Sequence, residues 1–339
     1  MDDTLIQVKN LQISFKYDGV MTPVIRGVSF DIKRGETLGM VGESGSGKSV
    51  TSREIMRLIA TPPARIDSGE ILFEGRDILK MSDDELRSIR GNRISMIFQE
   101  PMTSLNPVYT CGDQIMEVIR LHKGVSKKEA RQMAIEMLRE VGVQSPETRV
   151  DCYPHELSGG MRQRVMIAMA LACSPGLIIA DEPTTALDVT IQAQILDLLK
   201  ELKDKINSSI MLITHDLGVI ASMADYVVVM YAGRVVEKGT TEDIFHNPCH
   251  PYTIGLMKSK PVVGKKVDAL YNIPGSVPNP VNMPDYCYFR DRCEQCVEKC
   301  HGVYPPEIRV SDTHVVSCWR FEDKGTVERW PKSVNVEEL

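Results

Sequence analysis

The octapeptide GESGSGKS at residues 42–49 constrains the fold more than any other part of this sequence. It follows the apolar run TLGMV at 37–41 and precedes a helical pattern that begins SREIM. A strand, a glycine-rich loop and a helix in that order form a phosphate-binding loop (P-loop), in which backbone N–H groups and the helix dipole face phosphate oxygens. The sequence therefore predicts a nucleoside-triphosphate site.

Two side chains of this loop have defined chemistry. Lys48 would place a compact positive charge on the β- and γ-phosphates, and the Ser49 hydroxyl would bind Mg²⁺. We expect the nucleotide to be surrounded by Gly42, Glu43, Ser44, Gly45, Ser46, Gly47, Lys48, Ser49 and Val50.

A pair of acids ends the apolar run LIIADE at 177–182. Asp181 would hold Mg²⁺ through water, because Mg²⁺ dehydrates reluctantly. Glu182 would lie where a water molecule approaches the γ-phosphate and would act as the general base. Such a pair alone is more often a solvated strand end, but together with the P-loop it indicates a catalytic site.

Short β-branched runs alternate with helical patterns up to about residue 245, which predicts an α/β fold. Strands are expected at 37–41, 177–181, 210–214 and 226–231, and helices at 126–142 and 189–205.

Composition bears on the compartment and on the partners. The net charge of −6 does not favour nucleic acid, the N-terminus lacks a signal-peptide pattern, and no apolar run reaches the ~20 residues of a membrane span. We therefore expect a soluble, cytoplasmic chain. Thiols stay reduced in that compartment, so clustered cysteines indicate metal or redox chemistry rather than disulfides.

The segment LSGGMRQRVMIAMAL at 157–171 narrows the prediction to one family. Ser158, Gly159 and Gly160 open a long helix, which is a second anion-binding helix start. This loop resembles the signature loop of ABC-type ATPases, in which two subunits face head to tail and each signature closes over its partner's ATP. The order of GESGSGKS, Gln99, LSGGM, LIIADE, ALD and His215 is also that of the family.

The resemblance covers roughly residues 5–245 and implies an α/β ABC-type P-loop NTPase. Such a fold has a RecA-like core, an antiparallel β subdomain and an α-helical signature subdomain. We expect a nucleotide-binding domain over 1–250, with the helical subdomain at about 100–170, and a small Pro- and Cys-rich C-terminal extension over 251–339.

The resemblance also assigns roles to single residues. Gln99 would sense Mg²⁺ and the attacking water, His215 would contact the γ-phosphate, and Asp188 would communicate across the dimer. Phe15 would stack on adenine, with Tyr17 as the alternative. The implied catalytic residues are Glu182, His215 and Gln99, and the implied Mg²⁺ ligands are Ser49, Gln99 and Asp181.

QEPMTSLNPVYT and ADEPTTALDVTIQAQIL resemble the ATP-binding subunits of oligopeptide and dipeptide importers, a branch that includes nickel and oligosaccharide systems. This implies a peripheral subunit at the cytoplasmic face of the cell membrane. Its partners would be a second, paralogous ATP-binding subunit, two membrane permeases and an extracytoplasmic substrate-binding protein. Which cargo is carried stays open. The competing interpretations are a soluble ABC ATPase acting on nucleic acid or ribosomes, and a metal- or redox-sensing regulator.

Five of the nine cysteines lie between residues 287 and 318, after the proline-rich connector at 273–284. This segment resembles the C-terminal extension of the peptide-importer branch. The pattern of that extension selects Cys287, Cys293, Cys300 and Cys318 and leaves Cys296 as an extra thiol. Four thiolates suit a 4Fe–4S cluster or a structural zinc ion. The long, irregular gaps and the resemblance favour the cluster, with zinc or no metal as alternatives.

Overall fold

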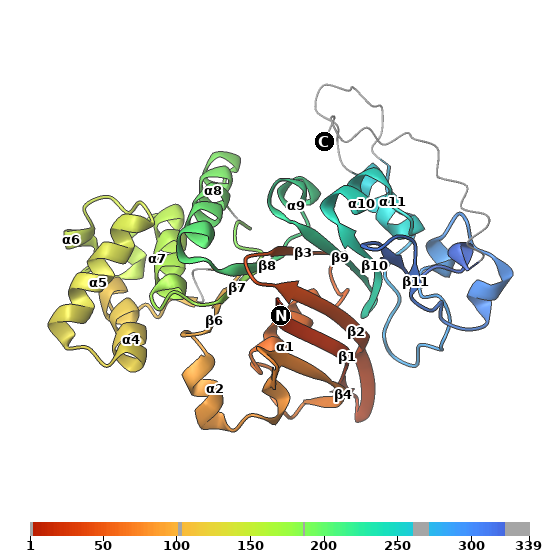
Figure 1. The fold of residues 1–339 in the computed structure, drawn as a ribbon, viewed down its shortest axis with the longest axis horizontal. Coiled ribbons are helices and arrows are strands. Elements are labelled where there is room, and N and C mark those ends of the chain that lie inside the picture. The colour runs from red at the N-terminus through yellow and green to blue at the C-terminus, as the bar shows by residue number, and fades with distance from the viewer. Residues whose placement is uncertain (1–2, 101–103, 186, 260–270, 323–339) are drawn as a thin grey trace. The chain divides into compact units, whose positions relative to one another are not determined.

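A computed structural model describes residues 3–100, 104–185, 187–259 and 271–322 (Figure 1). The chain divides into two compact units. The first contains residues 1–5, 32–37 and 78–213, and the second contains 6–31, 38–77 and 214–339. An element that crosses a boundary belongs to the unit that holds most of its residues.

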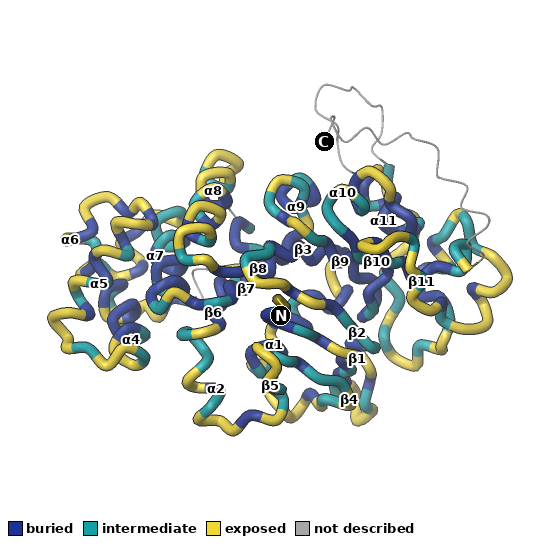
Figure 2. The backbone as a smooth tube through the Cα atoms, in the orientation of Figure 1, coloured by how far each residue is buried: buried dark blue, intermediate teal, exposed yellow. Residues whose placement is uncertain are grey.

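The first unit contains a parallel run of three strands. These are β6 (Ile94–Ile97), β7 (Leu177–Asp181) and β8 (Ser209–Ile213), and β7 pairs with both of the others. Every residue in them is buried (Figure 2), which is why their sequences are mostly apolar rather than alternating. The strand predicted at 177–181 is confirmed, and the one predicted at 210–214 lies one residue earlier.

Helices α4 (Cys111–Lys123), α5 (Lys127–Glu140) and α7 (Gly159–Leu171) of the same unit pack against one another (Figure 1). A capping box starts α5, because the Ser126 side chain accepts a hydrogen bond from the Glu129 backbone N–H and the Glu129 carboxylate accepts one from the Ser126 backbone N–H. The helix predicted at 126–142 is thereby confirmed. The unit also contains η1 (Ile78–Lys80), α2 (Asp83–Ile89), α6 (Pro146–Arg149), η2 (Pro154–Glu156) and α8 (Val189–Ile206), where η denotes a 3₁₀ helix.

The second unit contains the P-loop strand and an antiparallel sheet. Strand β3 (Thr37–Val41) pairs in parallel with β9 (Tyr226–Tyr231), and β9 pairs antiparallel with β10 (Arg234–Thr240). The antiparallel sheet has the order β2–β1–β4–β5. Its strands are β1 (Thr4–Tyr17), β2 (Val20–Lys33), β4 (Ala64–Phe73) and β5 (Arg76–Asp77). The helices of the unit are α1 (Lys48–Ile55), α9 (Leu217–Met223), α10 (Thr241–His246) and α11 (Pro251–Lys258).

The cysteine-bearing end of the chain consists of short elements. They are η3 (Arg290–Arg292), η4 (Glu298–His301), β11 (Ile308–Arg309), β12 (Val315–Val316) and η5 (Trp319–Phe321). Strand β12 pairs antiparallel with both β11 and β10, so this end of the chain continues the sheet of the second unit. Across the described ranges, no helix combines the length and the apolarity that a membrane crossing requires.

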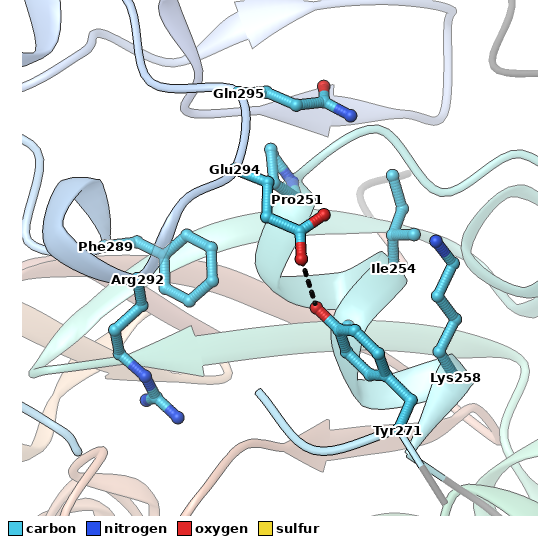
Figure 3. Close-up of a pocket in the computed structure, with 9 residues that line it drawn as sticks. Pro251, Ile254, Lys258, Tyr271, Phe289, Arg292, Glu294 and Gln295 are labelled. Carbon is cyan, nitrogen blue, oxygen red and sulfur yellow. Dashed lines mark hydrogen bonds between the residues drawn. The ribbon is translucent and has the colours of Figure 1, made fainter. Parts of the chain in front are cut away.

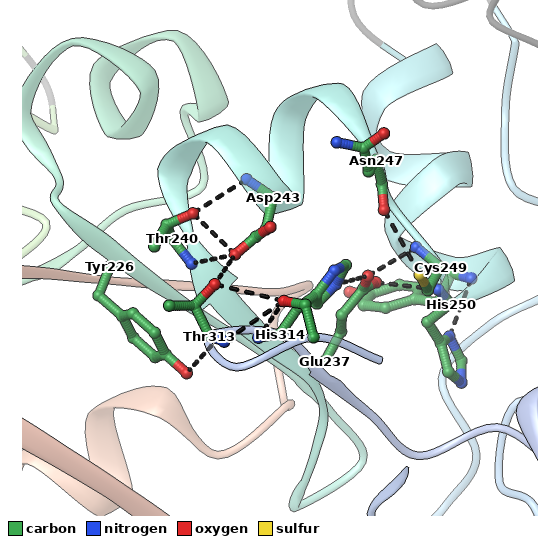
Figure 4. Close-up of polar contacts among 11 residues, drawn as sticks. Tyr226, Glu237, Thr240, Asp243, Asn247, Cys249, His250, Thr313 and His314 are labelled. Carbon is green, nitrogen blue, oxygen red and sulfur yellow. Dashed lines mark hydrogen bonds and ion pairs between the residues drawn. The ribbon is translucent and has the colours of Figure 1, made fainter. Parts of the chain in front are cut away.

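A buried carboxylate fastens this end to β10 (Figure 4). Glu237 accepts hydrogen bonds from the backbone N–H groups of Cys249, over 2.6 Å, and of His250, over 2.9 Å. Its Oε1 also lies 2.8 Å from Nε2 of His314, the residue before β12. A buried charge is tolerated when it has such partners, and here they come from two other segments of the chain, residues 249–250 and His314.

Candidate nucleotide-binding site

The P-loop joins β3 to α1, and its backbone requires glycine at two positions. Gly42 has a φ of 152°, and Gly47, the N-cap of α1, has a φ of 100°. A Cβ atom on Gly42 would lie 2.2 Å from the carbonyl oxygen of Met230, and one on Gly47 would lie 2.5 Å from Cδ1 of Ile25. Neither position has room for a side chain, so the loop curls tightly at the start of the helix.

Lys48 is buried at the start of α1, and its side chain bonds back to the backbone of the loop. Its Nζ donates hydrogen bonds to the carbonyl oxygens of Gly42, over 2.7 Å, and Glu43, over 3.1 Å. A buried ammonium group needs such acceptors. The positive charge is therefore held among the loop residues that were predicted to surround phosphate.

The end of β7 brings together two of the predicted catalytic residues. Asp181 is buried, and Glu182 follows it with a φ of 49°, in the left-handed region that non-glycine residues rarely adopt. Nε2 of Gln99 donates a hydrogen bond to Oε2 of Glu182 over 3.0 Å, and the Thr185 hydroxyl donates one to the same oxygen over 2.9 Å. Two donors thus orient one carboxylate beside a buried aspartate, while Glu182 is held in a conformation that costs energy.

The signature segment forms the N-terminus of α7. The Ser158 side chain caps the helix by accepting a hydrogen bond from the Met161 backbone N–H. Ser158 and Gly159 are exposed, and a Cβ atom on Gly159 would have no described atom within 4 Å. The result is an accessible helix start with free space at its first residue.

The other residues with predicted roles lie outside the P-loop and outside the end of β7. His215 is exposed and follows β8 by two residues, and Asp188 is the N-cap of α8, accepting a hydrogen bond from the Ile191 backbone N–H over 2.9 Å. Phe15 is half-buried in β1, whereas Tyr17 is 57% exposed. The roles of these residues stay predictions.

Two residues that no motif indicated also touch the P-loop. The Glu43 backbone N–H donates a hydrogen bond to the Tyr252 hydroxyl over 2.7 Å, and Nη1 of Arg292 lies 3.0 Å from Oε2 of Glu43. Neither is near the loop in sequence, and only the folded chain brings them to it.

The C-terminal cysteines form a second candidate site. Cys287, Cys300 and Cys318 are buried, and Cys293 is half-buried. Burial, reinforced by the neighbouring cysteines, raises the pKa of Cys287 and of Cys318 to about 12. These thiols thus need a bound cation to become thiolates, the form that ligates metals.

The spacing of the cysteine sulfurs bears on which metal fits. Among the described residues, no three of the C-terminal cysteines have all their sulfur atoms within 4.8 Å of one another. Tetrahedral zinc, with Zn–S bonds of about 2.3 Å, requires sulfurs about 3.8 Å apart. No three of these described sulfurs thus lie as close together as the sulfurs of a zinc site.

A further metal-like set consists of Glu237, Cys249 and His314, whose ligand atoms lie within 4.8 Å of one another. Burial raises the pKa of the Cys249 thiol far above its usual range. Glu237 already accepts two backbone hydrogen bonds, so the set is explained by the fastening of the chain end to β10.

Known proteins resemble this chain over nearly its whole length. Residues 25–185 match the family model described as "ABC transporter", and residues 236–300 match "Oligopeptide/dipeptide transporter, C-terminal region". The oligopeptide transport ATP-binding protein AppD of Bacillus subtilis (strain 168) is 52% identical over 322 residues, which are 95% of this chain and 98% of that protein. The dipeptide transport ATP-binding protein DppD of the same organism is 51% identical over 323 residues, 95% and 96% of the two chains.

Solved structures agree on the fold. The dimeric post-hydrolysis structure of the ATP-binding cassette MJ0796 bound to ADP and Pi has a TM-score of 0.62 and 30% identity, and the match covers 70% of this chain and 98% of that one. The structure of cbiO1 from Clostridium perfringens, part of the ABC transporter complex cbiONQ, has a TM-score of 0.61 and 28% identity, with 72% and 91% covered.

Proposed function

The chain belongs to the ABC transporter family, among its oligopeptide and dipeptide transport ATP-binding proteins, and from that membership we propose that its ATP hydrolysis drives the uptake of di- or oligopeptides. The structural observation that supports ATP hydrolysis is the pair of hydrogen bonds that Gln99 and Thr185 donate to Glu182 at the end of β7, and the peptide cargo is proposed from the relatives. They orient a carboxylate, as a general base for water requires.

Binding of ATP is assigned to the P-loop. The backbone amides of residues 42–50 and the charge of Lys48 hold the phosphates, and Phe15 stacks on adenine. Ser49, Gln99 and Asp181 hold Mg²⁺. Bound Mg²⁺ neutralises charge on the β- and γ-phosphates.

Hydrolysis is assigned to the residues around Glu182. Its carboxylate, oriented by Gln99 and Thr185, would take a proton from the attacking water as the water oxygen bonds to the γ-phosphorus. The bond from that phosphorus to the bridging oxygen would break, so that ADP leaves, and His215 would contact the γ-phosphate. No sequence motif predicted a role for Thr185, and only the structure reveals its contact with Glu182. Its hydroxyl donates to the same oxygen as Gln99, so it would still orient the carboxylate if Gln99 bound Mg²⁺ instead.

Assembly follows from the signature segment. Ser158, Gly159 and Gly160 at the accessible start of α7 would close over the ATP of a second ATP-binding subunit, a paralogous chain, in a head-to-tail dimer. Two membrane permeases and an extracytoplasmic substrate-binding protein complete the importer, and this subunit lies at the cytoplasmic face of the membrane. Its nucleotide-binding domain spans 1–250, with the helical subdomain at about 100–170, and its C-terminal extension spans 251–339.

We assign a 4Fe–4S cluster to Cys287, Cys293, Cys300 and Cys318. The long, irregular gaps between these cysteines in the sequence favour a cluster over zinc, and three of the thiols are buried. The cluster would be structural, because the described segment around these cysteines contains only short elements, and its buried cluster of Cys249, Val316 and Cys318 is small.

The Glu182→Gln variant tests the hydrolytic mechanism. The amide keeps the shape of the side chain but cannot accept a proton, so the ATPase rate should fall by about 10²–10⁴-fold while ATP still binds. Glu140→Gln is the matched control, because Glu140 is a surface carboxylate paired with Lys205. Hydrolysis by Glu182→Gln at the wild-type rate would overturn the assignment of the base.

The transported substrate is tested with the assembled importer. Dipeptides or oligopeptides, delivered by the substrate-binding protein, should stimulate its ATPase activity. Stimulation by Ni²⁺ or an oligosaccharide alone would overturn the peptide assignment and leave the ATPase mechanism standing.

A further inference from the structure

Arg292 joins the C-terminal extension to the P-loop within the second unit. It is the last residue of η3, and its side chain is only 7% exposed. Its Nη1 donates hydrogen bonds to Oε2 of Glu43 over 3.0 Å and to the Tyr231 hydroxyl over 3.3 Å. Its Nε donates to the carbonyl oxygen of Pro274 over 2.7 Å. One buried guanidinium thus connects the phosphate-binding loop, β9 and the proline-rich connector.

Glu43 is held at three of its groups. Its carboxylate pairs with Arg292, its backbone N–H donates to the Tyr252 hydroxyl over 2.7 Å, and its carbonyl oxygen accepts from Nζ of Lys48 over 3.1 Å. The second residue of the loop is therefore fixed from the C-terminal part of the chain. The same residue touches the lysine that is assigned to the phosphates.

Three aromatic rings pack against one another beside these contacts. The ring centroids of Tyr231 and Tyr252 are 4.7 Å apart, and that of Phe289 lies 5.3 Å from the first and 5.4 Å from the second. Ring pairs at these distances are mutually attractive. Figure 3 shows Phe289 and Arg292 projecting from one segment of the extension next to α11.

The described residues around Arg292 leave only a small cavity. The cavity beside it has a volume of about 20 Å³, enough for about one water molecule. Its lining also includes Lys258, Tyr271 and Glu294, and the last two are hydrogen-bonded to each other (Figure 3). The Arg292 guanidinium therefore has the Glu43 carboxylate as its charge partner among the described residues.

We propose that Arg292 is a positioning residue for the ATP site. It neutralises Glu43, whose carboxylate would otherwise repel the phosphates, and it fixes the loop residue whose carbonyl oxygen holds Lys48. The C-terminal extension thereby helps to set the affinity of the P-loop for ATP. This inference rests on the proposed function, because it requires that the loop bind ATP.

The Arg292→Met variant tests the inference in the full-length chain. Binding of a fluorescent, non-hydrolysable ATP analogue with Mg²⁺ should weaken roughly tenfold, since a hydrogen-bonded charge pair is lost. The KM for ATP should rise by a similar factor with little change in kcat, because the contact acts on binding rather than on the reacting atoms. Arg292→Lys should restore part of the affinity, because it keeps the charge but loses the planar fork.

Arg290→Met is the matched control. Arg290 lies in the same η3 turn, stacks on Tyr286 and bonds to Asp291, so its loss should leave ATP affinity unchanged. Glu43→Gln supplies a double-mutant cycle. The double variant Arg292→Met/Glu43→Gln should lose much less ATP affinity than the product of the two single losses. The reason is that both substitutions remove the same interaction.

The outcomes separate the inference from the function on which it rests. Unchanged ATP affinity in a folded Arg292→Met chain, or losses that multiply fully in the cycle, would overturn the inference alone. A wild-type chain that bound no ATP would overturn the proposed function as well. If Arg292→Met did not fold, wild-type affinity in both Arg292→Lys and Glu43→Gln would still overturn the inference.

Discussion

His250, the N-cap of α11, is buried, and its Nδ1 accepts a hydrogen bond from the Tyr252 backbone N–H over 3.1 Å. Burial lowers the pKa of this imidazole to about 4, and nearby Glu237 opposes the shift only in part. An unfolded histidine has a pKa of about 6.5. As the pH falls from about 6.5 towards 4, the unfolded chain gains a proton that the folded chain excludes, so folding is destabilised in that window and not above it.

The variant His250→Asn should remove this pH dependence, because asparagine can still cap the helix but does not titrate. The free energy of unfolding of the wild type, relative to that of the variant, should fall by about 2 kcal/mol between pH 7 and pH 5. Urea unfolding at a series of pH values measures the difference. Parallel curves for the two proteins would contradict a buried, neutral His250.

The extra thiol and a ligand thiol should differ when each is replaced. Cys300 is buried, whereas Cys296 is half-buried, with its sulfur 3.4 Å from Nε2 of His301. Under the cluster assignment, anaerobically purified Cys296→Ser should be brown with about four irons per chain, as the wild type should be, and Cys300→Ser should lose the metal. A colourless wild type with one zinc ion, or loss of iron in Cys296→Ser, would contradict the assignment.

At the scale of elements, the capping box of α5 gives a stability prediction that is separate from catalysis. Ser126→Ala removes the side chain that accepts the Glu129 backbone N–H, so the free energy of unfolding should fall by about 1 kcal/mol with no change in the KM for ATP. Chemical denaturation measures the loss. Ser88→Ala is the control: Ser88 lies in the last turn of α2 and caps nothing, so its effect should stay within about 0.5 kcal/mol.

Elements differed in how well the sequence predicted them, for a physical reason. Strands β3, β7 and β9 are buried almost throughout, so continuous apolar runs marked their bounds to the residue. The strands of the antiparallel sheet mix buried and exposed residues, and β1 contains Asn10 at a φ of 45° with register shifts beside it. No clean period-two pattern survives there, and only the family resemblance predicted that sheet.

At the scale of the whole molecule, sequence motifs predicted the residues of the candidate site but not the residues that hold them in place. Glycine and lysine in the P-loop, and the acids after β7, follow from spacing and residue type alone. Thr185 and Arg292 do not, because their roles are defined by contacts with Glu182 and Glu43 that arise only in the folded chain. The sequence alone does not indicate which distant carboxylate a given hydroxyl or guanidinium group will contact.

The contact between Glu43 and Arg292 has a consequence for biosynthesis, because the two residues are 249 positions apart. At roughly 5–20 residues per second, the ribosome makes the loop some 10–50 s before it makes the cation that neutralises it. A nascent chain, or one cut short before residue 292, has every nucleotide motif of the finished protein but an unneutralised Glu43. If Arg292 sets the affinity of the loop as proposed, ATP would be bound at full strength only after synthesis has passed the nucleotide motifs and reached the extension.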